Sequence, residues 1–106
     1  MTWYKVLKEE SLKEGDIFKA NAGSKELIVM RAAGKLYATS NLCTHEQYDL
    51  AEGFIDDGNL VCPNHFAIFK PQDGSVVSNP EGSGSIGPLK SYPIKVENGD
   101  VLVEVE

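Results

Sequence analysis

The chain has 106 residues, of which 42% are hydrophobic and 25% charged, and its formal net charge is −6 at pH 7. This length and composition predict one globular domain over residues 1–106. The acidic balance argues against a nucleic-acid partner and an anionic membrane surface, because both attract clustered lysine and arginine. The longest apolar runs, such as Leu27–Met30, have four residues, whereas a membrane-spanning helix needs roughly 20.

The amino-terminal stretch "MTWYKVLKEE" lacks the apolar core of a signal peptide. We therefore expect a cytoplasmic protein. In that reducing compartment two cysteines are more often metal ligands or redox groups than a structural disulfide.

The first 40 residues predict a series of β-strands, and no segment has a helical period over eleven or more residues. The Ala33–Gly34 pair is expected to turn a hairpin between the last two of these strands. The predicted strands are 3–7, 16–20, 26–32 and 35–40. The fold class is therefore predicted to be all-β.

The middle of the chain is richer in Gly, Asp, Asn and Pro, and this composition predicts a site held in loops. Short strands are expected at 60–62, 66–69 and 75–77, and residues 78–88 are too rich in Gly, Ser and Pro to form a strand. Beyond this region, Asn98 and Gly99 separate two further strand patterns, and Asn-Gly is the dipeptide most typical of a two-residue hairpin turn.

All the cysteines and histidines of the chain fall into two short motifs, "CTH" and "CPNH". These are Cys43 with His45 and, after 16 intervening residues, Cys62 with His65. Thiolate and imidazole bind zinc or the iron of an iron–sulfur cluster, and each spacing lets one loop present both side chains. The pattern predicts a four-ligand site formed by two loops.

Three other interpretations use the same residues. Cys43 and Cys62 could form a disulfide beside two unrelated histidines, or all four residues could be independent of one another. A structural zinc site is the stronger rival, although the single residue between Cys43 and His45 is shorter than the usual zinc spacing.

The two motifs resemble the Rieske [2Fe-2S] motif, Cys-x-His followed along the chain by Cys-x-x-His. The resemblance extends to "LAEGFIDDGNLVCPNHFAIFKPQDGSVVSNP" and "LKSYPIKVENGDVLVEV". The chain is similar to the ferredoxin component of bacterial aromatic-ring dioxygenase systems, of the biphenyl-dioxygenase ferredoxin kind.

The resemblance implies a β-sandwich or barrel base that carries a smaller cluster-binding subdomain at about 41–88. Cys43 and Cys62 would bind one iron of a [2Fe-2S] cluster, and His45 and His65 the other. The histidines would lie near the surface, and the cysteines deeper.

The resemblance also implies a range for the redox potential of the cluster. Relatives with high potential carry Ser and Tyr where this chain has Ala67 and Phe69, and those hydroxyls donate hydrogen bonds to the cluster sulfurs. Their absence, together with the nearby carboxylates, predicts a value of about −150 mV, the low end of the Rieske range. Phe66 stands where the family usually has glycine, and we expect it to pack in the core with Ile68 and Phe69.

An oxygenase subunit would need further histidines for a mononuclear iron, and the chain has only the two already assigned. No dinucleotide fingerprint is present either. The sequence therefore predicts a monomeric electron carrier, not an enzyme, between an NADH-dependent flavin ferredoxin reductase and a terminal oxygenase. An acidic stretch that includes Asp49 and Glu52 would steer it toward its partners. The alternatives are the small Rieske subunit of an assimilatory nitrite reductase and a zinc-stabilised interaction module.

Overall fold

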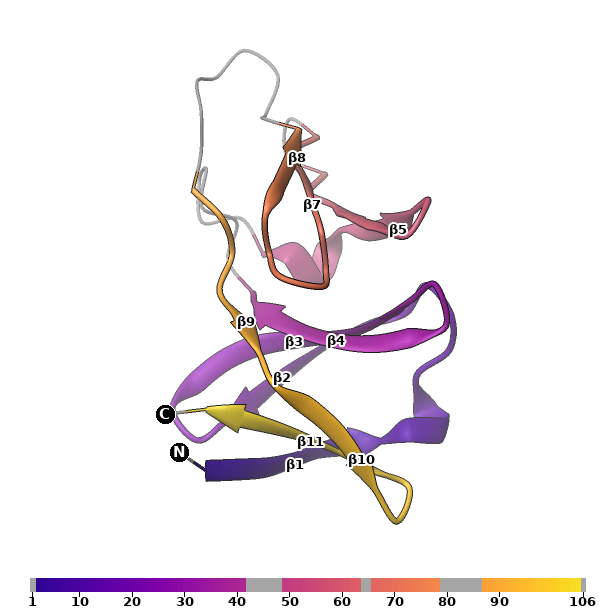
Figure 1. The fold of residues 1–106 in the computed structure, drawn as a ribbon, viewed down its shortest axis with the longest axis vertical. Coiled ribbons are helices and arrows are strands. Elements are labelled where there is room, and N and C mark those ends of the chain that lie inside the picture. Colours follow the sequence, from indigo (N-terminus) through magenta and orange to yellow (C-terminus); the bar gives the residue numbers. More distant parts are fainter. Residues whose placement is uncertain (1, 42–48, 64–65, 79–86, 106) are drawn as a thin grey trace.

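The computed structural model describes residues 2–41, 49–63, 66–78 and 87–105. Three antiparallel sheets are stacked along the long axis of the molecule (Figure 1). The described part contains no α-helix, only the 3-10 turns η1 (Glu9–Ser11) and η2 (Leu50–Glu52). None of its helices is long or apolar enough to cross a membrane. The all-β prediction is confirmed.

The base sheet, lowest in Figure 1, has the strand order β1–β11–β10. Its members are β1 (Thr2–Lys8), β10 (Ile94–Glu97) and β11 (Asp100–Val105). Asn98 and Gly99 join β10 to β11 with φ angles of 52° and 81°. These positive values are those of a type I′ turn, so the predicted Asn-Gly hairpin is confirmed.

The middle sheet has the order β2–β3–β4–β9. Its members are β2 (Ile17–Ala22), β3 (Lys25–Ala32), β4 (Lys35–Ser40) and β9 (Ser91–Tyr92). Ala33 and Gly34 turn the chain between β3 and β4 with φ angles of 53° and 78°, and this predicted hairpin is also confirmed.

The upper sheet has the order β5–β6–β7–β8. Its members are β5 (Phe54–Asp56), β6 (Asn59–Val61), β7 (Ile68–Phe69) and β8 (Val76–Ser78). The sequence analysis missed β5. Asp57 and Gly58, with φ angles of 51° and 77°, form a hairpin turn between β5 and β6, so the Asp-Gly dipeptide held the signal for this strand.

Strand β3 is buried on both faces, which explains its unbroken apolar sequence. Leu27 and Val29 face the core between the base and middle sheets, while Ile28 and Met30 face the core below the upper sheet. We call the second of these the upper core. Its buried members are Ile28, Met30, Leu50, Leu60, Cys62, Ala67, Phe69 and Leu89.

The carboxy-terminal strand pattern differs from the prediction because it divides at Pro93. Tyr92 pairs with Ala38 in the middle sheet, whereas Ile94 pairs with Val103 in the base sheet. Proline has no N–H to donate to a ladder, so it suits a point where the chain leaves one sheet for another. The Pro93 carbonyl still accepts a hydrogen bond from the Glu104 N–H at 3.0 Å.

Candidate metal centre

Cys62 follows β6 directly and lies in the upper core with no solvent exposure. Its backbone N–H donates a hydrogen bond to the Ala67 carbonyl at 2.8 Å, which closes the second cysteine–histidine loop at its base. Cys43, His45 and His65 lie outside the described residues. The structure therefore places one of the four predicted ligands, and it places that one deep.

Phe66 differs from the prediction that it packs in the core. Its side chain is 53% exposed, and its φ is +58°. This left-handed conformation breaks the extended strand expected at 66–69, so only Ile68 and Phe69 pair in β7. Left-handed backbone is costly for a bulky residue and is adopted most easily by glycine, the residue that the family resemblance implies here.

At position 66 the glycine variant should be more stable than the alanine variant, which is the reverse of the usual order in a strand. We expect Phe66→Gly to be about 1 kcal/mol more stable than Phe66→Ala, because glycine adopts φ +58° without steric cost. Phe54 is a matched control, since it is 45% exposed but extended in β5. There alanine should be the more stable, as is usual in a strand. Urea unfolding of the four variants measures both differences, and the same order at both positions would contradict the backbone argument.

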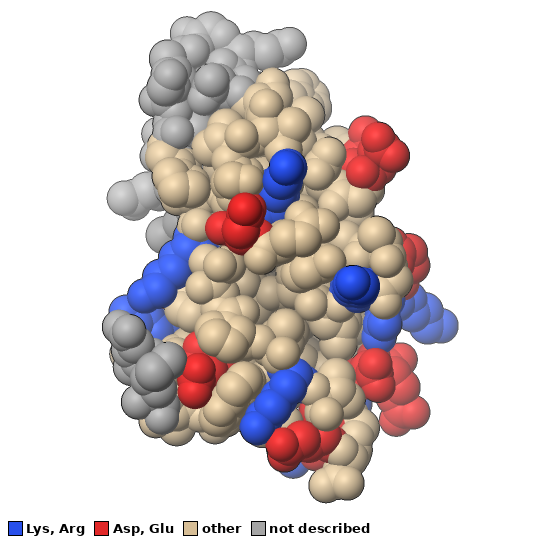
Figure 2. All heavy atoms as spheres, viewed as in Figure 1, with Lys and Arg blue, Asp and Glu red and all other residues tan. Residues whose placement is uncertain are grey.

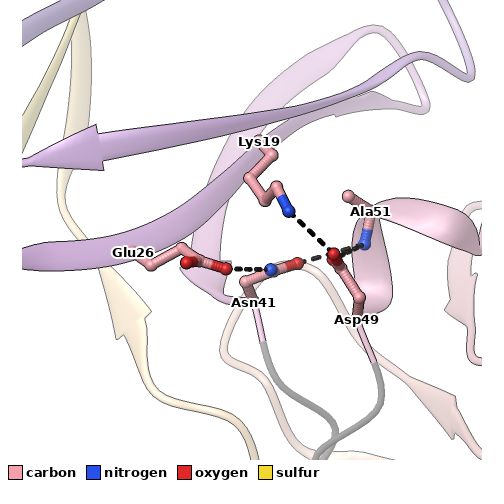
Figure 3. A network of polar contacts seen from close by, with 5 residues as sticks. All are labelled: Lys19, Glu26, Asn41, Asp49 and Ala51. Carbon is pink, nitrogen blue, oxygen red and sulfur yellow. Dashed lines mark hydrogen bonds and ion pairs between the residues drawn. The ribbon is translucent and has the colours of Figure 1, made fainter.

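The first cysteine–histidine loop is bounded by Asn41 and Asp49, and polar contacts link these two residues to the middle sheet (Figure 3). The Leu50 N–H donates to the Asn41 carbonyl at 2.8 Å. The Asp49 carboxylate caps η2 by accepting from the Ala51 N–H at 3.1 Å, and it accepts from Lys19 Nζ at 2.8 Å. The loop is therefore closed at its neck.

Asp49 does not behave as an unpaired acid of the acidic stretch. The hydrogen bond from Lys19 is the main cause that lowers the pKa of its carboxyl group, and desolvation opposes the shift. Contacts with Asn41 and Ala51 lower the pKa further. The sequence places Lys19 thirty residues away, so charge counting along the chain could not show that this carboxylate is neutralised.

The lowered pKa of Asp49 predicts acid sensitivity. A carboxyl group whose pKa is lower in the folded state stabilises the fold above its ordinary pKa, and this stabilisation disappears as pH falls through the folded value. We expect Asp49→Asn to lower the urea midpoint at pH 7, and the difference from wild type to shrink as pH falls from about 4 through the lowered pKa of Asp49. The same substitution in a Lys19→Gln background should show a smaller difference. A difference that is independent of pH would contradict this account.

Both residues that the resemblance implies in place of hydroxyl donors are buried. Ala67 and Phe69 have no solvent exposure and belong to the upper core together with Cys62. Phe69 pairs with Leu60 on one side and with Val76 on the other. Neither side chain can donate a hydrogen bond. The apolar surroundings of Cys62 agree with the sequence argument for a low potential.

Acidic side chains do not gather into one patch on the face shown in Figure 2, where basic side chains lie among them. Glu52 at the end of η2, Asp56 at the end of β5 and Asp57 in the following turn are exposed. Glu46, the other acid of this stretch, lies outside the described residues. Partner steering by the acidic stretch stays a prediction.

A buried cysteine in a loop closed at its base, within a donor set of two cysteines and two histidines, fits an iron–sulfur cluster. Residues 2–93 match the Rieske [2Fe-2S] domain family. The chain belongs to this family. As a Rieske protein it carries one [2Fe-2S] cluster.

The relatives of this Rieske protein include small ferredoxins. The ferredoxin component of the naphthalene 1,2-dioxygenase/salicylate 5-hydroxylase systems of a Ralstonia species is 30% identical over 104 residues, which are 98% of this chain and 96% of the relative. The solved structure of the ferredoxin of carbazole 1,9a-dioxygenase from Nocardioides aromaticivorans matches with a TM-score of 0.89 and 26% identity, and the match covers both chains completely. This Rieske protein is accordingly an electron-carrying ferredoxin and not a catalytic subunit.

A third comparison is with a solved complex of reduced oxygenase and oxidised ferredoxin in carbazole 1,9a-dioxygenase. The matching chain of that complex has a TM-score of 0.84 and 31% identity, and the match covers 98% of this Rieske ferredoxin and 97% of the solved chain.

The sequence analysis missed two residues that hold the first cysteine–histidine loop, Asn41 and Lys19. An asparagine two residues before Cys43 was a possible signal for the first, but nothing local marked the second.

Proposed function

We propose that this ferredoxin carries one electron at a time from a flavin-dependent reductase, which oxidises NADH, to the terminal oxygenase of an aromatic-ring dioxygenase system. The observation that carries the proposal is the nearly complete match to a chain of the carbazole oxygenase–ferredoxin complex. The carrier acts as a monomer, because it must present the same site to two partners in turn.

The proposed ligands are Cys43 and Cys62 for one iron and His45 and His65 for the other, in a cluster-binding subdomain at about 41–88. The bound [2Fe-2S] cluster takes up and releases a single electron. The protein contributes the surroundings: burial of Cys62 keeps water from that thiolate, and the hydrogen bond from its N–H to Ala67 holds the loop. The upper sheet supports this second loop through β6 and β7.

Iron and sulfide analysis with EPR, before and after dithionite, tests the cofactor. We expect about two irons and two sulfides per chain, with a rhombic signal that appears only on reduction. A colourless protein that contains zinc and no sulfide would contradict the proposal and leave the zinc-stabilised interaction module. A potentiometric titration should then follow a one-electron curve.

Stopped-flow oxidation of the reduced protein tests the partner. The electron acceptor would be the purified oxygenase of carbazole 1,9a-dioxygenase, and the control acceptor the sirohaem subunit of an assimilatory nitrite reductase. We expect rapid oxidation by the oxygenase, at a rate that saturates with oxygenase concentration. Rapid oxidation by the sirohaem protein alone would favour the nitrite reductase alternative.

A further inference from the structure

We propose that four polar side chains form a clasp that positions the first ligand loop against the middle sheet. The polar clasp consists of Lys19, Glu26, Asn41 and Asp49 (Figure 3). The inference rests on the proposed function, because that proposal makes Cys43 and His45 ligands. The clasp residues are positioning residues, since none of them is a proposed ligand.

Asn41 makes three contacts that tie the start of the loop to its end and to β3. Its carbonyl accepts from the Leu50 N–H at 2.8 Å, and its side-chain oxygen accepts from the Ala51 N–H at 3.1 Å. Its side-chain nitrogen donates to Glu26 Oε1 at 2.6 Å. Both polar atoms of the side chain are thus used, and a neighbouring strand fixes its orientation.

Asp49 ties the end of the same loop to β2. One carboxylate oxygen accepts from the Ala51 N–H, and the other accepts from Lys19 Nζ at 2.8 Å. Because Lys19 lies on β2 and Glu26 on β3, the two ends of the loop are held by two adjacent strands of one sheet. The clasp thereby fixes the neck in position and in orientation.

The two ligand loops consequently have different supports. Cys62 directly follows β6 of the upper sheet, whose described strands pair only with one another, while the clasp holds the ends of the first loop to the middle sheet. A four-ligand site shared between two sheets requires a fixed relation between them. Packing of Ile28 and Met30 in the upper core holds the sheets together, and the clasp orients the first loop on that support.

The burial and pairing of Asn41 favour a role in loop geometry beside its contribution to stability. Asn41 is 1% exposed, and even a fully paired buried amide stabilises a fold by only about 1 kcal/mol per hydrogen bond, because its bonds to water are lost. A fully paired polar network does, however, specify one arrangement. Loss of one contact should therefore alter the ligand loop before either sheet unfolds.

The test exchanges donor and acceptor across the contact between Asn41 and Glu26. Asn41→Asp retains an acceptor for the Ala51 N–H but loses the donor and places two carboxylates together. Adding Glu26→Gln restores a donor, now from position 26. With the iron-loaded protein, we expect Asn41→Asp to accelerate bleaching by a chelator at least about tenfold and to broaden the EPR spectrum. The double variant should return to within about threefold of wild type.

Asn21→Asp is the matched control, because Asn21 is exposed and pairs with Glu26 across β2 and β3 without joining the clasp. Its bleaching rate should stay at the wild-type value. Lys19→Gln, which removes only an exposed partner, provides a milder variant if Asn41→Asp does not fold, and it should accelerate bleaching by about threefold.

Two results would overturn the clasp. One is a variant with a lowered urea midpoint but wild-type bleaching rate, EPR spectrum and potential. The other is a double variant that bleaches as fast as Asn41→Asp. A wild-type protein that binds no iron and sulfide would instead overturn the proposed function, and the clasp with it.

Discussion

Replacing Gly74 with alanine is expected to destabilise the protein by about 2 kcal/mol more than the same replacement at Gly58. Both glycines have a φ of +77°, so both variants incur the same backbone strain of about 1 kcal/mol. The two positions differ in the space available to the added methyl group. A Cβ at position 74 would overlap the Leu89 carbonyl oxygen, whereas nothing lies within 4 Å of a Cβ at position 58.

The Gly74 contact joins the β7–β8 turn to the segment that leads into β9. The Leu89 N–H donates to the Gly74 carbonyl at 2.8 Å, and the Gly74 N–H donates to the Lys70 carbonyl at 2.7 Å. Leu89 also fills part of the upper core, so neither backbone can move away without cost. Urea unfolding of both variants gives the difference directly, and equal stabilities would show that the two segments can separate.

The second large effect is expected on the redox potential. Ala67→Ser combined with Phe69→Tyr should raise the potential by about 100 mV, because hydroxyl donors stabilise the more negative, reduced cluster. Both positions are fully buried beside Cys62 in the upper core. The surroundings are therefore dry, and a hydrogen bond there is stronger than one in water.

Potentiometric titration of wild type, the double variant and Phe69→Tyr alone measures this effect. Wild type should titrate at about −150 mV, and a value above about +100 mV would contradict the argument. Phe69→Leu is a control at the same position, because it changes the packing without adding a donor. A shift in Phe69→Leu as large as that in Phe69→Tyr would assign the effect to packing rather than to the hydroxyl.

Local sequence was sufficient where a structure depends on neighbouring residues. The turns at Ala33–Gly34 and Asn98–Gly99 were predictable because a two-residue turn needs positive φ angles that few residues adopt. The same signal was present at Asp57–Gly58 but was missed, because β5 has only three residues. Short strands gain their stability from the sheet and leave little trace in their own sequence.

Long-range contacts explain the predictions that were wrong or incomplete. The apolar residues after Pro93 look like a continuation of those before it, yet Tyr92 and Ile94 pair in different sheets. Phe66 looks like a core residue by composition, but its backbone is left-handed and its ring is exposed. Only the assembled sheets decide which way such residues face.

The sequence by itself predicted the cluster of the centre, and the match to the Rieske [2Fe-2S] domain family confirms it; the ligand residues stay a prediction. Two cysteines and two histidines in two motifs are a ligand inventory that depends on residue type and spacing, so it can be read without a fold. The tertiary structure decided what surrounds that inventory. It buried Cys62 beside Ala67 and Phe69, and it joined Lys19 to Asp49 across thirty residues. Such contacts arise when sheets pack, because packing brings together side chains that chain order keeps apart.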